Sequence, residues 1–133
     1  MTPVYNPGDN IQSLSPKGSA ANLAKAKLAI DIAVEKQASD ILLLDVQELT
    51  PLTDYVIILT ADNFRQLNGL SEDIRETLKS RNIDLHHLEG SPDSGWMLMD
   101  FTDVIIHLFS TEQRSFYDLE QIWNKAKQLI RIQ

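Results

Sequence analysis

The stretch that decides the fold is Trp96-Met-Leu-Met-Asp-Phe-Thr-Asp-Val-Ile-Ile-His-Leu-Phe109, followed after two residues by Glu112-Gln-Arg-Ser-Phe-Tyr-Asp-Leu-Glu-Gln-Ile-Trp123. Its first part has two apolar runs separated by Asp100-Phe-Thr-Asp103. This predicts a hairpin, because antiparallel strands can be joined by a short turn whereas parallel strands need a crossover. The apolar residues that follow recur at helical spacing and predict a helix over about 112–132. Its expected inward stripe is Phe116, Leu119, Trp123, Ala126 and Leu129 with Ile130.

Outward from this unit, apolar periodicity predicts the other elements. They are a helix from about Ser19 to Ser39, strands at Ile41–Val46 and Tyr55–Thr60, a helix over about Asn63–Ser80, and a weak polar strand at Asp84–Leu88. The order predicts one α/β domain over residues 19–133, with a mixed sheet of about five strands flanked by helices. The helix after the second strand should form a right-handed crossover. Prolines and glycines among polar residues indicate a flexible extension over residues 1–18.

Length and composition favour a single cytosolic domain. A chain of 133 residues that is 43% hydrophobic can bury a core without disulfides. No apolar run approaches the roughly 18–20 residues of a membrane span, and the N-terminal sequence lacks the pattern of a secretory signal. The absence of cysteine excludes disulfide frameworks and thiolate chemistry and is compatible with a cytoplasmic location.

The charge is uneven along the chain. Nineteen acidic residues against 12 basic ones give a net charge of -7, which argues against direct binding to nucleic acid. Between residues 82 and 124 the only base is Arg114. The acids in that range are Asp84, Glu89, Asp93, Asp100, Asp103, Glu112, Asp118 and Glu120. Such a surface favours a positively charged protein partner, although it can also be an ordinary solvated face.

Catalytic and metal-binding patterns are weak. Asp100 and Asp103 could coordinate a metal or act as an acid/base pair, but aspartate is favoured in turns because its carboxylate accepts backbone N–H bonds. His107 in a strand is more often packed than catalytic. The adjacent His86 and His87 would point to opposite faces of a strand and could not chelate one ion. No glycine-rich phosphate loop or nucleophile motif occurs, so we expect no catalytic residue, metal or cofactor.

The start of the last predicted helix has a recognition pattern. Arg114, Tyr117 and Glu120 recur every three residues and should share a face. They could be a simple surface ion pair, in which Arg114 meets Asp118 or Glu120. Arginine and aromatic residues also dominate interface hot spots, and Trp96 with Tyr117 would supply two anchors.

Four blocks of the chain together resemble a known family. They are Asp54-Tyr-Val-Ile-Ile with Thr60, then Glu89-Gly90, then Trp96-x-x-x-Asp100-x-x-Asp103-Val-x-x-His107, and Arg114-x-x-Tyr117-x-Leu-Glu120-x-x-Trp123. The pattern resembles the iojap-like family of ribosomal silencing factors (RsfS) and covers about residues 20–127. The last block is its most specific part.

The resemblance implies a non-enzymatic translation repressor with a nucleotidyltransferase-like fold. Such a factor binds the large ribosomal subunit through its ribosomal protein fourteen and blocks joining of the small subunit when nutrients are scarce. By analogy, the partner-binding residues are Trp96, Asp100, Asp103, His107, Arg114, Tyr117 and Glu120, with Asp54 and Tyr55 as weaker candidates. Trp123 is expected to anchor the last helix to the sheet.

The chain departs from the family pattern at two places, and two alternative functions remain. The family's hairpin commonly has glycine where this chain has Thr102, so the turn can differ, and residues 1–18 have no counterpart in the family core. One rival function is a metal-dependent nucleotidyltransferase or its relic, using Asp100, Asp103 and Asp45. The other is a homodimeric interaction module without a ribosomal role.

Overall fold

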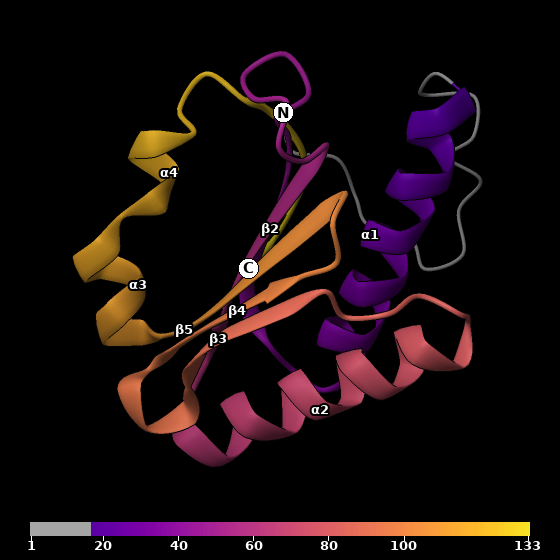
Figure 1. The fold of residues 1–133 in the computed structure, drawn as a ribbon. Coiled ribbons are helices and arrows are strands. Elements are labelled where there is room, and N and C mark those ends of the chain that lie inside the picture. Colours follow the sequence, from indigo (N-terminus) through magenta and orange to yellow (C-terminus); the bar gives the residue numbers. More distant parts are fainter. Residues whose placement is uncertain (1–16) are drawn as a thin grey trace.

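The computed structural model describes residues 17–133, which form a six-stranded sheet with helices on both faces (Figure 1). The first half contains α1 (Lys17–Glu35), β1 (Ser39–Asp45), β2 (Tyr55–Ala61) and α2 (Phe64–Ser80). The second half contains β3 (His87–Ser91), the 3-10 helix η2 (Pro92–Ser94), β4 (Trp96–Asp100), β5 (Val104–Ser110), α3 (Thr111–Tyr117), α4 (Leu119–Ile122) and β6 (Lys127–Ile132). Of the extension predicted over residues 1–18, residues 1–16 lie outside the described part.

The sheet is mixed, as predicted, but has six strands in the order β3-β4-β5-β2-β1-β6 instead of about five. β2 and β5 are parallel, and the other neighbouring pairs are antiparallel. It follows that β2 and β3 run in the same direction and that α2 connects them. All seven residues of β2 are buried, as expected for a central strand covered on both faces.

The long C-terminal helix predicted over 112–132 is wrong. The helix ends at Tyr117 because Asp118 adopts a left-handed backbone conformation, with φ 46° and ψ 53°. After the short α4, the chain extends as β6 and pairs with β1. The apolar residues Leu129, Ile130 and Ile132 pack against the main core. Without β6, the backbone N–H and C=O groups on the outer edge of β1 would lack partners. This pairing outweighs the local helical spacing of the apolar residues in 127–132.

The remaining predicted elements are largely confirmed. β4 and β5 form the expected antiparallel hairpin. β2 and α2 agree with the predicted bounds to within a residue, and the Asn63 side chain caps α2 by accepting a hydrogen bond from the Gln66 amide at 2.8 Å. The weak strand is displaced from 84–88 to 87–91, so His86 precedes the strand instead of lying within it.

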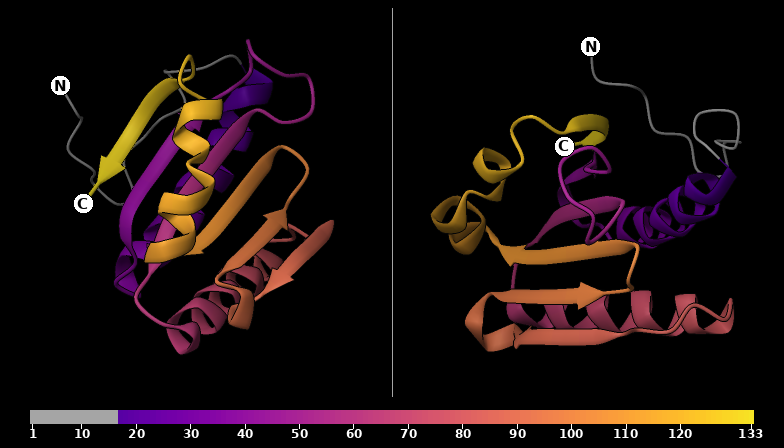
Figure 2. Two further views of the ribbon diagram at one scale, coloured as in Figure 1. Left: turned by 90° about the vertical axis from the view of Figure 1, so that its left-hand side faces the viewer. Right: turned by 45° about the horizontal axis from the view of Figure 1, so that its top comes forward.

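The two faces of the sheet carry cores of different size. The larger core lies under α1 and α2 and includes Ile30, Ile57, Ile74 and Ile106. The smaller core lies on the opposite face, where Leu119 and Trp123 pack against residues of β1, β2 and β5. Trp123 therefore anchors its segment to the sheet, as predicted. Figure 2 shows α3 and α4 on the side of the sheet away from α1 and α2.

The turn between β4 and β5 is backbone-strained at Thr102. Its φ is 77°, a region that residues with a Cβ atom rarely adopt. The Asp103 amide donates to the Phe101 carbonyl at 3.0 Å, closing a γ-turn around Thr102. The Thr102 amide donates to Asp100 Oδ1 at 2.7 Å, which confirms a turn-building role for Asp100.

We expect Thr102→Gly to stabilise the protein by roughly 0.5–1 kcal/mol. Removing the Cβ relieves about 1–2 kcal/mol of left-handed strain, and the greater freedom of unfolded glycine offsets roughly 0.5–1 kcal/mol of that gain. Urea unfolding followed by circular dichroism would measure the change. Thr102→Ala is the matched control because it keeps the Cβ and should give little gain. A Gly variant less stable than the parent would contradict the assignment of strain.

Candidate functional site

Four rings from three elements form an aromatic stack on the sheet face beneath α3. It consists of Trp96 of β4, His107 and Phe109 of β5, and Tyr117 at the end of α3. Trp96 lies opposite Phe109 in the β4–β5 register, and His107 is two residues before Phe109, so the three side chains project from the same face. The Trp96 and His107 rings are nearly parallel, with 9° between planes and 6.2 Å between centroids, and the Trp96 ring is tilted against Tyr117 at 5.6 Å.

Trp96 is positioned by two glycines with positive φ. Gly95 ends η2 at φ 76°, and a Cβ there would meet the Ser110 Oγ at 2.7 Å. Gly90, across the hairpin on β3, has φ 81°, and a Cβ there would overlap the Trp96 carbonyl oxygen. Both positions therefore require glycine. This gives the Glu89-Gly90 block a physical role, which is to let β3 approach the start of β4.

His107 is a neutral scaffold residue within the stack. The Trp96 indole Nε1–H donates to His107 Nδ1 at 3.2 Å, so in the neutral ring the proton is on Nε2. Burial lowers the pKa of His107 from 6.5 to about 4, because the charged imidazolium would lose its hydration. At neutral pH the residue therefore contributes a flat, uncharged ring and an acceptor for the Trp96 indole.

The two aspartates of the predicted site, Asp100 and Asp103, lie at the other end of the β4–β5 hairpin. Asp100 ends β4 and Trp96 begins it, so about four residue steps, or roughly 13 Å, separate them along the strand. Asp100 and Asp103 are both partly exposed. The Asp103 carbonyl accepts the amides of Asp54 and Tyr55 at 3.0 and 3.1 Å and so holds the turn against the start of β2.

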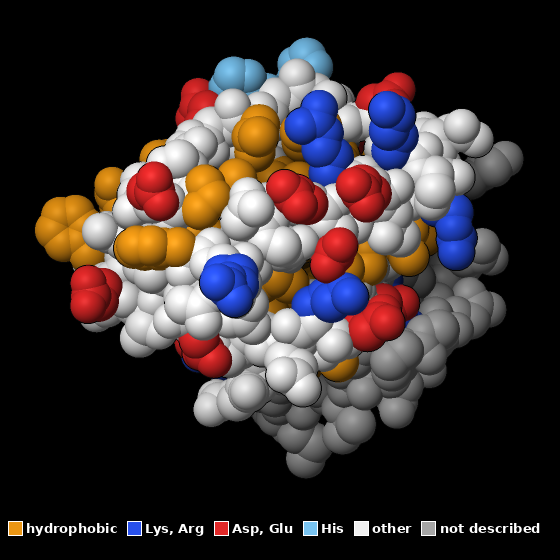
Figure 3. Space-filling model, turned by 90° about the horizontal axis from the view of Figure 1, so that it is seen from below, with side chains coloured by type: hydrophobic (Ala, Val, Ile, Leu, Met, Phe, Trp, Pro, Cys, Tyr) orange, Lys and Arg blue, Asp and Glu red, His pale blue; other side chains and the backbone are white. Residues whose placement is uncertain are grey.

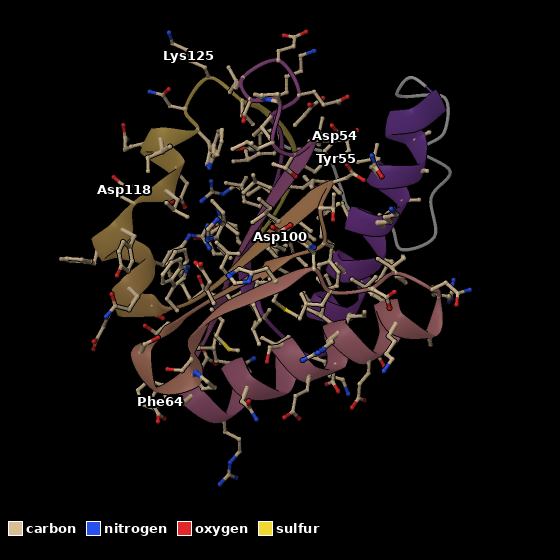
Figure 4. The ribbon with its side chains drawn as sticks, in the orientation of Figure 1. Asp54, Tyr55, Phe64, Asp100, Asp118 and Lys125 are labelled. Atoms are coloured by element: carbon tan, nitrogen blue, oxygen red, sulfur yellow. The ribbon has the colours of Figure 1, made fainter. Side chains whose placement is uncertain are left out.

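Asp54 and Tyr55, the weaker candidates, are tied into the scaffold at this end (Figure 4). Asp54 Oδ2 accepts a hydrogen bond from Asn22 Nδ2 of α1 at 2.8 Å. Tyr55 is fully buried, and its hydroxyl accepts from Gln47 Nε2 at 3.3 Å. Because Tyr55 is fully buried, it cannot act as a surface anchor.

Arg114 is buried, with 7% of its surface exposed. Its Nε donates to Glu120 Oε1 at 2.8 Å, and its Nη1 donates to the Asp40 carbonyl at 2.7 Å and to Thr60 Oγ1 at 2.9 Å. Its Nη2 also lies 3.5 Å from Asp40 Oδ2. The ion pair with Glu120 anticipated from sequence therefore forms, but between α3 and α4 and beneath the surface. We call this set of contacts the Arg114 network.

The backbone of β1 is shaped to meet this guanidinium group. Asp40 has φ 46°, and the β1–β2 register shifts between Ser39 and Leu42. Such a bulge re-aims backbone groups, and here the Asp40 carbonyl accepts from Arg114. Asp40 Oδ1 also accepts from Arg131 of β6 at 3.0 Å, so one aspartate links α3 to the sheet edge.

The aspartates of the rival metal site do not converge. Asp45 pairs with Tyr55, Tyr55 with Val104, and Asp100 with Ile105. Three strand spacings, or roughly 14 Å, therefore separate Asp45 from Asp100, whereas Mg²⁺ and Ca²⁺ hold oxygen ligands at about 2–2.6 Å. Within residues 17–133, no group of three or more His, Asp or Glu side chains could hold one metal ion.

The sequence prediction missed two exposed residues. Phe116, placed in the inward stripe, is 77% exposed, and Ile122 is 66% exposed. The helical spacing of Phe116, Leu119 and Trp123 had indicated that all three side chains face the core. The adjacent aromatic pair Phe116-Tyr117 was the one available signal, because neighbours in a helix cannot both face the core.

The comparisons with known proteins decide the family. Residues 19–133 match the family model described as ribosomal silencing factor during starvation (RsfS). The chain belongs to the RsfS family. It is 31% identical over 100 residues to ribosomal silencing factor RsfS of Bacillus subtilis, covering 75% of this chain and 85% of the relative.

Organellar relatives extend the similarity. The chloroplastic protein Iojap of Zea mays is 35% identical over 124 residues, which cover 93% of this chain and 50% of that protein. The mouse protein named mitochondrial assembly of ribosomal large subunit protein 1 is 30% identical over 105 residues, covering 74% of this chain and 46% of the relative.

Solved structures share the fold. The crystal structure of a Chromobacterium violaceum protein superposes with a TM-score of 0.74 at 32% identity, covering 77% of this chain and 85% of the other. A Bacillus halodurans structure gives a TM-score of 0.70 at 22% identity, covering 84% and 99%. Within residues 17–133, no helix is long and apolar enough to cross a membrane.

We expect protein stability to fall as the pH drops from 6.5 toward 4. The folded-state pKa of His107 lies below its unfolded value, so the unfolded chain binds the proton first and acid favours unfolding. The full loss is about 3 kcal/mol, and His107 contributes no such loss above pH 6.5.

Unfolding free energies measured by urea titration across this pH range would test the effect. In His107→Gln the dependence should flatten, whereas the exposed His87→Gln control should keep it. Burial raises the pKa of Asp31, but this residue is common to all three proteins and cancels in the comparison. Identical pH profiles for the parent and His107→Gln would refute the assignment.

Arg114→Met should lower the unfolding free energy by about 2–3 kcal/mol. The change removes the basic partner of Glu120 and leaves Asp40 paired with Arg131 alone. Both carboxylates are partly hydrated, so the loss falls at or below the lower end for a broken buried pair. Arg114→Lys should recover only part of the loss, because an ammonium group cannot reproduce the planar fork. Thermal and urea unfolding would measure both. Arg75→Met, at an exposed site on α2, is the control and should change stability by less than about 0.5 kcal/mol.

Proposed function

We propose that this protein is a ribosome-silencing factor that acts by occupying a surface. It binds the large ribosomal subunit through its ribosomal protein fourteen, at the face that meets the small subunit. While bound, it blocks subunit association sterically and so represses translation under nutrient limitation. The observation that carries the proposal is the match of residues 19–133 to the RsfS family model.

The names of relatives are compatible with this role. The B. subtilis protein is named a ribosomal silencing factor, and the mouse protein is named for assembly of the large ribosomal subunit. A cytoplasmic, non-enzymatic role follows from the same proposal. Steric exclusion needs no turnover, which agrees with an aromatic stack whose histidine is committed to a structural hydrogen bond.

We assign the predicted partner-binding residues to two groups by their burial and contacts. Tyr117, the accessible part of Trp96, Asp100 and Asp103 would contact the partner directly. His107, Arg114 and Glu120 would position them, because His107 holds the Trp96 indole and the Arg114–Glu120 pair holds α3 against α4. A surface that presents both exposed rings and acidic side chains complements a basic ribosomal protein.

The decisive experiment is sedimentation of the purified protein with purified ribosomal subunits on a sucrose gradient. The protein should travel with the large subunit and reduce formation of complete ribosomes when small subunits are added. Comigration with neither subunit would reject the proposal. Comigration without any effect on subunit joining would reject the steric mechanism.

Asp100→Asn with Asp103→Asn should slow association with large subunits roughly threefold to tenfold at low salt and flatten its salt dependence. Asparagine keeps the side-chain acceptor that closes the turn and removes only charge. Stopped-flow association at several salt concentrations would measure both effects. Glu72→Gln with Glu76→Gln removes two charges from α2 and is the matched control. Equal salt slopes in the two double variants would remove Asp100 and Asp103 from the binding surface.

A further inference from the structure

The outer surface of α3 and α4 holds two large apolar side chains that no other part of residues 17–133 covers. Phe116 is 77% exposed and Ile122 is 66% exposed. The Phe116 ring stands edge-on to Tyr117, with 5.2 Å between centroids and 83° between planes. Phe116 thus continues the aromatic stack outward into solvent. Phe116 and the 46% exposed Tyr117 therefore form a contiguous exposed apolar group, and such groups mark interaction sites in soluble proteins.

A break in the helix produces this exposure. In one unbroken helix, Phe116, Leu119 and Trp123 would lie on one face and could all pack inward. The left-handed conformation of Asp118 interrupts that face, so Leu119 and Trp123 pack on the sheet whereas Phe116 is turned out. Ile122, the last residue of α4, lies outside this inward stripe and is also exposed. We call Phe116 and Ile122, with the chain between them, the α3–α4 ridge.

The charge around the ridge selects its partner. Glu112 and Asp118 are exposed on or beside α3. Arg114, the only base on α3 or α4, is buried and faces the carboxylates of Asp40 and Glu120. The solvent-facing surface of α3 and α4 therefore offers negative charge without an opposing base. Lys125 and Lys127 lie beyond the end of α4.

Figure 3 shows hydrophobic and acidic side chains next to one another at its left edge, the side on which α3 lies. A surface of this kind complements a protein that presents lysine or arginine around an apolar hollow. It would be repelled by nucleic-acid phosphates or by an anionic membrane.

We propose that Phe116 and Ile122 are direct anchors for the basic ribosomal protein that this factor binds, and that the break at Asp118 turns Phe116 outward. This inference rests on the proposed function and adds the α3–α4 ridge to the predicted contact residues. Phe116 and Ile122 fill an apolar hollow on the partner, and Glu112 and Asp118 face basic groups at its rim.

The test is the double variant Phe116→Ser with Ile122→Ser. Because both side chains are mostly exposed, circular dichroism and the melting temperature should match the parent. Affinity for purified large subunits, measured by cosedimentation over a concentration series, should fall at least roughly tenfold. Ile122→Ser alone should cause a smaller loss. Leu52→Ser removes an 82% exposed apolar side chain from the β1–β2 connection and should bind like the parent.

The outcomes separate this inference from the proposed function. If the parent does not bind large subunits, the proposed function fails. If the parent binds large subunits and both ridge variants bind as tightly as the parent, the ridge is not an anchor and only this inference is overturned. It is also overturned if the parent self-associates in sedimentation velocity, or binds phosphatidylglycerol vesicles, in a manner that the double variant loses.

Discussion

The arrangement on the second face of the sheet depends on one buried guanidinium group. Arg114 reaches from α3 to the Asp40 carbonyl of β1, the Thr60 hydroxyl of β2 and the Glu120 carboxylate of α4. A planar fork with several fixed donors can satisfy these acceptors together, which a lysine could not do. Through Asp40 the same network reaches Arg131, so α3, α4, β1, β2 and β6 share one polar junction.

This junction explains how a small apolar core can hold two short helices. α4 spans only four residues and α3 only seven, lengths at which isolated helices do not form in water. Leu119 and Trp123 supply apolar contact below them. The Arg114 network supplies directional contacts that fix how α3 meets α4, and hence which side chains point to solvent. The exposed rings of Phe116 and Tyr117 are therefore held on a defined support.

The candidate binding surface combines two parts with different physical origins. The aromatic stack is set by strand register, because Trp96, His107 and Phe109 are on one face of β4 and β5. The acidic turn is set by backbone hydrogen bonds that hold Asp103 against the start of β2. The rigid β4–β5 hairpin keeps them about one strand length apart. A partner that touches both must present an extended surface, as a protein does and a small molecule does not.

Sequence by itself determined the elements whose signal is local. Two apolar runs separated by Asp100-Phe-Thr-Asp103 predicted the β4–β5 hairpin, periodic leucines and isoleucines predicted α2, and the block from Arg114 to Trp123 indicated the family. The tertiary structure decided what local patterns could not encode. β6 formed from residues with helical spacing because the edge of β1 needed backbone partners, and Arg114 was drawn inward because Asp40 and Thr60, distant in sequence, offered acceptors there. The exposure of Phe116 followed from the left-handed backbone of Asp118 between α3 and α4, which the helical spacing of the apolar residues did not predict.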